Sequence, residues 1–152
     1  MRNTLVVSFD ITFALKNIEN IGIAIAKTKD MADNNQGRLI FPIKDSNGQV
    51  CGFSARKIVE DPDAPKYVNS PETVIFTKGN ILYNFHQAKQ TAKHDGYIYV
   101  VEGFMDVFAL DCIGITSCVA LMSTKLTDKH IDLLKRLGVE IRVCLDGDKP
   151  GQ

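Results

Sequence analysis

The sequence predicts an α/β fold whose last third is a parallel sheet. Between residues 97 and 145, apolar strand-like segments alternate with segments of helical period, and the connecting loops are short. The expected order is strand 97–101, helix 104–112, strand 117–121, helix 127–137 and strand 139–145. Strands separated by helices pair in parallel through right-handed crossovers. The part upstream predicts a mixed α+β subdomain, so the chain combines two kinds of structure.

A β-hairpin is predicted where the sequence first becomes readable. Segments 38–43 and 49–56 are extended in pattern, and Asn47-Gly48 between them is a strong hairpin signal. Pro42 has no N–H for a sheet ladder, which predicts that the first strand lies at an edge or ends there. Residues 1–37 show no clear pattern and are set apart as an N-terminal segment.

A stiff loop and a helix complete the upstream subdomain, which we predict to span residues 38–95. Residues 59–73 contain three prolines and carry Lys66, Tyr67 and Asn69. A short strand over 74–76 is expected next. A helix is then expected from an Asn80 N-cap to about His94, with Gly96 beyond its end. The parallel sheet would occupy residues 96–152.

Composition excludes several classes of protein. Eighteen basic and eighteen acidic residues cancel, so any nucleic-acid binding requires a local basic patch. The four cysteines form no C-x-x-C pair and have no histidine at ligand spacing, so no zinc is expected in this chain. We interpret them as reduced and buried, in a cytoplasmic protein. The apolar runs are too short to span a bilayer, and no membrane partner is expected.

Acidic residues follow two of the predicted parallel strands. Glu102 comes directly after strand 97–101, and Asp146 and Asp148 follow strand 139–145. Parallel strands end at the same sheet edge, where clustered carboxylates favour Mg²⁺ or Mn²⁺. The alternative is that Glu102 caps a helix and that Asp146-Gly-Asp148 is a polar turn. Asp106 lies at i+4 from Glu102, and alone it is equally well an acid placed at a helix start.

Basic and aromatic residues in the upstream half could form a phosphate-binding face. Arg56, Lys66, Tyr67 and Lys78 lie at predicted strand ends or on the stiff loop. Cations with one aromatic ring for stacking suit a nucleic-acid strand. Taken without other information, the same residues are typical of an ordinary solvated surface, and that interpretation is favoured at this point.

The quoted motifs resemble a known family. Glu102-Gly-Phe-Met-Asp106, followed by Asp146-Gly-Asp148, resembles the toprim domain, a Rossmann-like metal-binding module. Upstream, residues 38–43, 48–56 and 65–73 together with Lys78 are similar to the RNA polymerase core of bacterial DnaG-type primases. Segment 65–73 is the most specific part, because other toprim proteins such as topoisomerases and nucleases lack it.

The resemblance implies a function for each matching residue. Glu102 would be the central catalytic acid, Asp106 a further catalytic acid, and Glu102, Asp146 and Asp148 the ligands of Mg²⁺ or Mn²⁺. The residues that match the family's basic ridge for template and nucleotide are Arg56, Lys66, Tyr67, Asn69 and Lys78. The implied reaction is template-directed synthesis of short RNA primers on single-stranded DNA from ribonucleoside triphosphates.

The sequence also departs from the family pattern. Full-length primases place a zinc-binding domain before this core and a helicase-binding domain after it, and neither is expected here. Contact with the replicative helicase would therefore need a domain absent from this chain. The toprim sheet is expected to be incomplete, because the chain stops before a later acidic pair. That would leave 139–145 as an exposed apolar edge.

Three alternatives to a primase core stay open. The chain could be a non-catalytic nucleic-acid-binding remnant of a primase, with the basic ridge but without a complete metal site. A fragment of a toprim nuclease or topoisomerase is disfavoured by segment 65–73. A receiver-like signalling domain needs adjacent acids after its first strand, which Val101-Glu-Gly103 does not supply.

Overall fold

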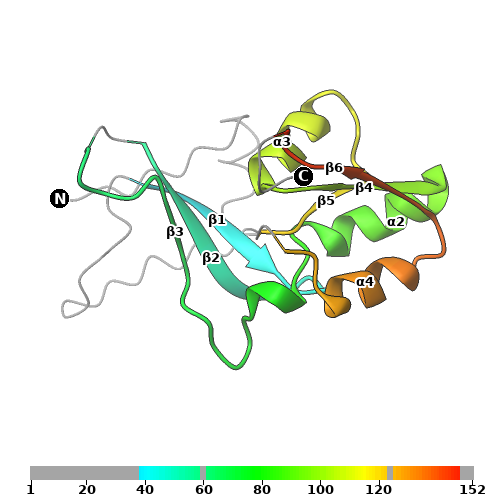
Figure 1. Ribbon diagram of the computed structural model, residues 1–152, viewed down its shortest axis with the longest axis horizontal. Coiled ribbons are helices and arrows are strands. Elements are labelled where there is room, and N and C mark those ends of the chain that lie inside the picture. The colour runs from blue at the N-terminus through cyan, green and yellow to red at the C-terminus, as the bar shows by residue number, and fades with distance from the viewer. Residues whose placement is uncertain (1–37, 59–60, 123–124, 148–152) are drawn as a thin grey trace. The chain divides into compact units, whose positions relative to one another are not determined.

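The structure is a computed structural model that describes residues 38–58, 61–122 and 125–147. The elements along the chain are β1 (Arg38–Lys44), β2 (Val50–Lys57), β3 (Tyr67–Asn69), η1 (Lys78–Asn80), α2 (Phe85–Asp95), β4 (Tyr97–Val101), α3 (Phe104–Cys112), β5 (Cys118–Ala120), α4 (Asp128–Lys135) and β6 (Glu140–Cys144) (Figure 1). The described residues divide into two compact units, 38–42 with 52–70 and 43–51 with 71–147. No helix in these ranges has the length and apolar character needed to span a bilayer.

The upstream sheet contains three strands in the order β1-β2-β3. Gly48 lies in the turn between β1 and β2 with a φ of 89°, a conformation that glycine adopts without steric cost. The turn closes through a hydrogen bond from the Asp45 N–H to the Gln49 carbonyl, at 2.9 Å. Among the residues that the structure describes, β1 lies at the edge of this sheet, in agreement with the prediction from Pro42.

The downstream sheet is parallel, as the alternation of strands and helices predicts. Its order is β5-β4-β6, and β4 pairs in parallel with both neighbours. β4 and α3 have the predicted bounds, whereas β5, α4 and β6 are shorter than predicted at their ends. The fold class is therefore confirmed. α2 packs on β4 and β5. The predicted division between residues 95 and 96 stays a prediction.

Helices cover both faces of this sheet. Ile98 and Val100 of β4 point to the face that α2 and α4 cover, and they form one core with Ala88 of α2 and Leu134 of α4. α3 packs against β4 and β5 from the other face (Figure 1). The period-two alternation in β4 thus separates an apolar face from a face that carries the tyrosines at 97 and 99. Because helices cover both faces of the sheet, the carboxyl end of β4 lies between them.

Segment 74–76 is not a strand, and α2 begins later than predicted. Val74 is fully exposed and Ile75 is 71% exposed, whereas Phe76 is 1% exposed. Phe76 packs with Ile43 and Ile81 in a small core of its own. α2 begins at Phe85, and its N-cap is Asn84 rather than Asn80, which instead ends the short helix η1. The three apolar residues 74–76 therefore form a turn in which only the Phe76 ring is buried.

The cysteines are free, but the prediction that they are buried is wrong for two of them. Cys118 in β5 is buried, and this burial raises the pKa of its thiol to about 12. Cys51 is half-buried, whereas Cys112 and Cys144 are exposed. Cys112 is the last residue of α3, and Cys144 ends an edge strand, so neither is enclosed by neighbouring elements.

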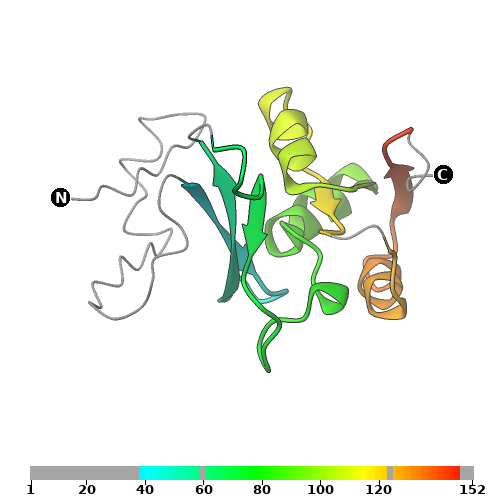
Figure 2. The same cartoon turned by 60° about the vertical axis from the view of Figure 1, so that its left-hand side comes forward.

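β6 forms an open edge of the downstream sheet, as the sequence predicts for 139–145. The opposite edge is partly covered, because Tyr83 forms an antiparallel bridge with Ala120 of β5. β6 has no strand beyond it in the described part of the chain, and Val143 is 58% exposed. Figure 2 shows β6 at the margin of the sheet, beside α4.

Candidate functional site

The predicted acidic residues lie at the ends of two neighbouring strands. Val101, the last residue of β4, pairs with Cys144, the last residue of β6. Glu102 follows Val101 directly, and Asp146 lies two residues beyond Cys144. Since adjacent strands run about 5 Å apart, both carboxylates emerge at the same edge of the sheet. Glu102 is half-buried and Asp146 is exposed, so the edge is open to solvent on the Asp146 side.

The backbone around Glu102 is held by β5 and the residues that follow it. The Met122 N–H donates to the Glu102 carbonyl at 3.2 Å, and the Leu121 N–H donates to the Val101 carbonyl at 3.0 Å. Met122 has a φ of 57°, in the left-handed region that non-glycine residues rarely adopt. Such strain costs about 1 kcal/mol and is typical of functional sites. Glu102 is therefore fixed on both sides of its peptide.

Asp106 has a structural contact that explains its place. Its Oδ2 atom accepts the N–H of Gly103, the N-cap of α3, at 3.0 Å. The Asp106 N–H in turn donates to the Gly103 carbonyl at 3.1 Å. This reciprocal arrangement stabilises the first turn of α3 and matches the predicted alternative of an acid at a helix start. A catalytic role for Asp106 remains a prediction.

The carboxylates fit a divalent cation with few protein ligands. Mg²⁺ is commonly held by one or two carboxylates, with waters and substrate phosphates completing its octahedron. Glu102 and Asp146, which follow β4 and β6 at one sheet edge, would supply two such ligands. Within the described residues no group of three His, Cys, Asp or Glu side chains is close enough to hold a metal. The third predicted ligand, Asp148, lies outside those residues.

Four of the five residues predicted to bind nucleic acid or nucleotide lie on β2, on β3 or, for Lys66, directly before β3. Arg56 is directly opposite Tyr67, and Ser54 is directly opposite Asn69, so these four side chains share one face. The Arg56 guanidinium lies 5.7 Å from the centre of the Tyr67 ring, and the Lys66 ammonium lies 5.8 Å from it. We call Arg56, Lys66, Tyr67 and Asn69 the β2–β3 face.

Two basic residues that sequence reasoning missed hold this face in place. Arg38 is 5% exposed, and its Nη1 donates to the Pro65 carbonyl at 2.8 Å. The Lys57 ammonium donates to the Ala64 carbonyl at 2.7 Å and also to the carbonyl of Asp61. Both cations thus bind main-chain oxygens of the proline-rich loop just before Lys66. Basic residues flanking such a loop are the only signal in the sequence.

Asn69 has an acceptor atom without a donor. Its Oδ1 is buried and receives no hydrogen bond from any residue that the structure describes. Buried polar atoms are nearly always paired, so an orphaned acceptor marks a place where a donor is needed. It lies on the same face as Arg56 and Tyr67.

Lys78, the fifth predicted binding residue, belongs to the other compact unit. It begins η1, and the N-terminal turn of α4 binds the backbone of that short helix. The His130 Nε2 lies 3.3 Å from the Lys78 carbonyl and 3.1 Å from the Ile81 carbonyl. The Thr127 hydroxyl donates to the Gly79 carbonyl at 2.5 Å. His130 is fully buried, which explains its place in the sequence as a structural rather than a catalytic histidine.

Acidification is expected to destabilise the chain through His130. Burial is the main cause that lowers the pKa of His130, opposed by the two backbone carbonyls that it contacts. The unfolded chain then takes up a proton that the folded chain refuses. The stability contribution is present above the ordinary pKa of 6.5 and is lost as the pH falls below it. Urea unfolding at pH 7.5 and 5.5 should show a loss of up to about 1.4 kcal/mol from this group.

The matched variants for this measurement are His130→Gln and His86→Gln. Burial and the nearby Lys44 and Lys89 also lower the pKa of His86, so it adds to the loss in the same direction. His130→Gln keeps a donor near the Lys78 carbonyl and should reduce the pH dependence. If His130→Gln left the pH dependence unchanged, the histidine would not be the group that titrates.

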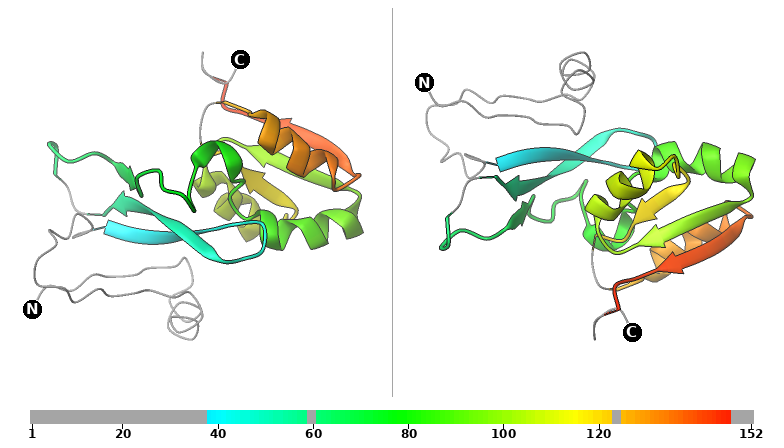
Figure 3. Two further views of the ribbon diagram at one scale, coloured as in Figure 1. Left: turned by 90° about the horizontal axis from the view of Figure 1, so that it is seen from below. Right: turned by 90° about the horizontal axis from the view of Figure 1, so that it is seen from above.

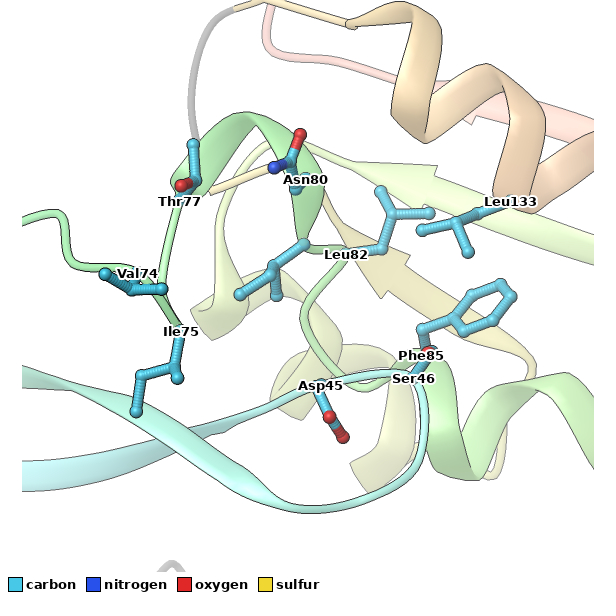
Figure 4. A pocket seen from close by; sticks show the side chains of 10 residues that line it. Asp45, Ser46, Val74, Ile75, Thr77, Asn80, Leu82, Phe85 and Leu133 are labelled. Atoms are coloured by element: carbon cyan, nitrogen blue, oxygen red, sulfur yellow. The ribbon is translucent and has the colours of Figure 1, made fainter.

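A pocket of about 220 Å³ is lined by residues other than these candidate residues. Its lining comes from the turn after β1, from segments 74–77 and 80–82, and from Phe85 and Leu133 (Figure 4). Asp45 is its only carboxylate, and that side chain accepts the N–H groups of Asn47 and Gln49, both at 2.9 Å. The carboxylate therefore stabilises the hairpin turn, and the pocket contains none of the predicted site residues.

Comparisons with known proteins identify both halves of the chain. The family described as "DNA primase catalytic core, N-terminal domain" matches residues 3–89, and the family described as "Toprim-like" matches residues 99–152. The DNA primase of Listeria monocytogenes is 44% identical over 121 residues, which cover 80% of this chain and 19% of that protein. The chain spans about a fifth of the length of the curated relatives it matches.

Solved structures agree with this assignment. The crystal structure of the Aquifex aeolicus primase, containing its zinc-binding and RNA polymerase domains, matches with a TM-score of 0.73 at 36% identity, covering 90% of this chain and 34% of that one. A structure of the DnaG primase catalytic domain bound to single-stranded DNA matches with a TM-score of 0.65 at 44% identity, covering 76% of this chain and 36% of that one. The chain belongs to the family of bacterial DnaG-type DNA primases.

Proposed function

We propose that this chain is part of a primase catalytic core that adds ribonucleotides to a short RNA primer on a single-stranded DNA template. Glu102 and Asp146, with Asp148, would hold Mg²⁺ or Mn²⁺. The β2–β3 face and Lys78 would hold the template strand and the nucleotide. The site of action would be the cytoplasm, where bacterial DNA is replicated.

The chemistry asks the protein mainly for positioning and charge. A divalent cation bound at this edge would neutralise triphosphate charge and favour the 3′-hydroxyl as a nucleophile. Glu102 is suited to hold it, because its peptide is fixed by the hydrogen bond from Met122 and its side chain is half-buried. Asp146 is exposed, so it can act as a ligand with water around it.

The β2–β3 face has the composition of a platform for a single strand. Base stacking on an aromatic ring is worth about 1–3 kcal/mol per base and tolerates any sequence. Arg56 and Lys66 flank the Tyr67 ring, so a stacked base would place its phosphates beside two cations.

The observation that carries the proposal is the register between β4 and β6. Because Val101 pairs with Cys144, the acid after β4 and the acid after β6 are forced to the same sheet edge. This occurs in a chain of the primase family, whose reaction depends on a divalent metal. Neither the register nor the family membership would suffice alone, since an acid after one strand is common turn chemistry.

A second candidate function is binding of nucleic acid without catalysis. It is favoured by one observation: Glu102 and Asp146 are the only predicted metal ligands within the described residues, and no third carboxylate, histidine or cysteine joins them there. A site that depends on Asp148 for its third ligand would bind metal weakly if Asp148 did not reach it. The β2–β3 face would be unaffected.

One experiment separates the two candidates. Binding of a fluorescein-labelled single-stranded DNA is measured by anisotropy over a series of salt concentrations, and primer synthesis is measured on the same strand with Mn²⁺ and labelled ribonucleotides. Tyr67→Ala should weaken DNA binding about 5- to 150-fold, which corresponds to the loss of one stacked base. Lys66→Ala should lower the slope of log K against log salt by about one.

The control for both variants is Lys93→Ala. Lys93 is an exposed lysine in the last turn of α2 and lies outside the β2–β3 face. Binding of DNA without any primer would favour the non-catalytic candidate. Equal DNA binding by wild type and Tyr67→Ala would refute the assignment of the face in both candidates.

A further inference from the structure

The three-residue helix η1, which begins at Lys78, has little structure of its own. Its N-cap, Thr77, makes no side-chain hydrogen bond to the helix, and none of the residues of η1 is buried. The Asn80 N–H donates to the Thr77 carbonyl at 2.9 Å, and the Ile81 N–H donates to the Lys78 carbonyl at 3.3 Å. Helices of this kind have poor hydrogen-bond geometry and extend over only a few residues. The position of Lys78 must therefore be set by contacts from outside η1.

The N-terminal turn of α4 binds carbonyl groups of η1 and of the residue after it. The Thr127 hydroxyl donates to the Gly79 carbonyl at 2.5 Å. The His130 Nε2 lies 3.1 Å from the Ile81 carbonyl and 3.3 Å from the Lys78 carbonyl. A Cβ atom added at Gly79 would lie 3.3 Å from Cγ2 of Thr127, so the two segments approach closely. Figure 3 shows η1 beside α4, and both belong to one compact unit.

The capping box of α4 fixes the direction in which His130 donates. The Thr127 N–H donates to Nδ1 of His130 at 3.4 Å, and the His130 N–H donates to the Thr127 hydroxyl at 3.2 Å. A backbone N–H can only donate, so Nδ1 is the acceptor and the imidazole proton lies on Nε2, which faces η1. His130 is 0% exposed, so bulk water does not compete for that proton. The two side chains that cap α4 therefore also hold the backbone that carries Lys78.

We propose that Thr127 and His130 are positioning residues for Lys78, through which they set the affinity of this chain for the triphosphate of a ribonucleotide. Neither side chain would touch the nucleotide, because both act on carbonyl groups of the backbone. Lys78 contacts the nucleotide only if the proposed function holds, so the positioning role rests on that function. The lysine stem is flexible, and a backbone that also moved would keep the ammonium near the phosphates for a smaller part of the time.

Thr127→Val tests the positioning step without any ligand. Valine keeps the shape of the threonine side chain and removes the hydroxyl that binds the Gly79 carbonyl. Amide hydrogen exchange of Asn80 and Ile81 should become about 2- to 10-fold faster, which corresponds to the loss of one hydrogen bond. Thr127→Ser keeps the hydroxyl and should exchange like the wild type. The control is Thr91→Val, the same replacement at a half-buried position of α2, which should leave this exchange unchanged.

The functional readout is the affinity for ATP with Mg²⁺, measured by isothermal titration in a double-mutant cycle. Lys78→Ala should weaken ATP binding at least about tenfold, as expected for the loss of a charged contact. Thr127→Val should weaken it about 2- to 10-fold, and Thr127→Ser should bind like the wild type. In the Lys78→Ala background, Thr127→Val should have no further effect, because it acts only through Lys78. A residue needed merely for the stability of the fold would weaken binding in both backgrounds.

Two substitutions of His130 separate its contacts with η1 from its contact with the cap. His130→Gln can still place an N–H near the position of Nε2, and it should bind ATP nearly like the wild type. His130→Asn keeps an acceptor near the position of Nδ1 but is too short to reach the carbonyls of Lys78 and Ile81. It should weaken ATP binding as Thr127→Val does. This pair decides the question if Thr127→Val does not fold.

Three results would overturn the positioning role alone. They are unchanged exchange of Asn80 and Ile81 in Thr127→Val, losses of ATP affinity in Thr127→Val and Lys78→Ala that simply add, and equal ATP affinities of His130→Gln and His130→Asn. A different result would refute the proposed nucleotide contact itself. That result is ATP binding that is absent in the wild type or equal in the wild type and Lys78→Ala.

Discussion

Replacing Glu102 by glutamine is expected to lower the affinity for Mn²⁺ at least about tenfold and primer synthesis at least about 100-fold. The substitution keeps the size of the side chain and removes only the charge that a hard cation requires. The carboxylate at position 102 is half-buried at the end of β4, on a peptide fixed by the Met122 N–H. Isothermal titration with Mn²⁺ and a primer assay on single-stranded DNA measure the two effects.

Asp132→Asn is the matched control for this substitution. Asp132 is an exposed carboxylate on α4, away from the ends of the parallel strands in the sequence and in the fold. It should bind Mn²⁺ and make primers like the wild type. DNA binding should be unchanged in both variants, because the β2–β3 face keeps its charges. If Glu102→Gln bound Mn²⁺ with wild-type affinity, Glu102 would not be a metal ligand.

The position of Glu102 and Asp146 at the same edge of the sheet was predictable, because it follows from the alternation of strands and helices alone. Helices between strands imply parallel pairing, and parallel strands end at one edge. The order β5-β4-β6 was not predictable in the same way, since the choice of neighbour for β4 depends on packing across the whole sheet. That order is what makes Glu102 and Asp146 neighbours, with no strand between them.

The structural functions of several polar residues were less readable. Arg38 and Lys57 bind main-chain carbonyls. Because every residue has a carbonyl, the sequence does not show which of them will accept a hydrogen bond. His130 likewise contacts the carbonyls of Lys78 and Ile81. Asp106 was different, because an acid at the start of a predicted helix is a recognised signal, and the structure places it in the first turn of α3, where it accepts the Gly103 N–H.

The acidic edge and the β2–β3 face therefore depend on different kinds of contact, each within its own compact unit. The acidic edge is positioned by strand pairing, which the pattern of apolar residues encodes. The β2–β3 face is positioned partly by Arg38 and Lys57, whose loss would release the loop that carries Lys66 without touching any ligand. Mutations at Arg38 or Lys57 would thus resemble mutations of the face itself in a binding assay, although neither side chain is on it.

Phe76→Ala is expected to destabilise the chain by about 3–5 kcal/mol, whereas Val74→Ala should change stability by less than about 0.5 kcal/mol. Phe76 is 1% exposed and packs with Ile43 and Ile81, so truncation leaves a cavity beside these two side chains. Val74 is fully exposed. The difference is measured by urea unfolding of the 152-residue chain at pH 7.5.

The pair of variants also discriminates between a strand and a turn in segment 74–76. In a strand, residues 74 and 76 would face the same side and both truncations would be costly. In the observed turn, the Phe76 N–H donates to the carbonyl and the hydroxyl of Thr73, which directs only the phenylalanine ring inward. Phe76→Leu, expected to cost less because it leaves a smaller void, keeps the comparison measurable if the alanine variant does not fold. Equal losses for Val74→Ala and Phe76→Ala would contradict the turn and favour a strand packed on one face.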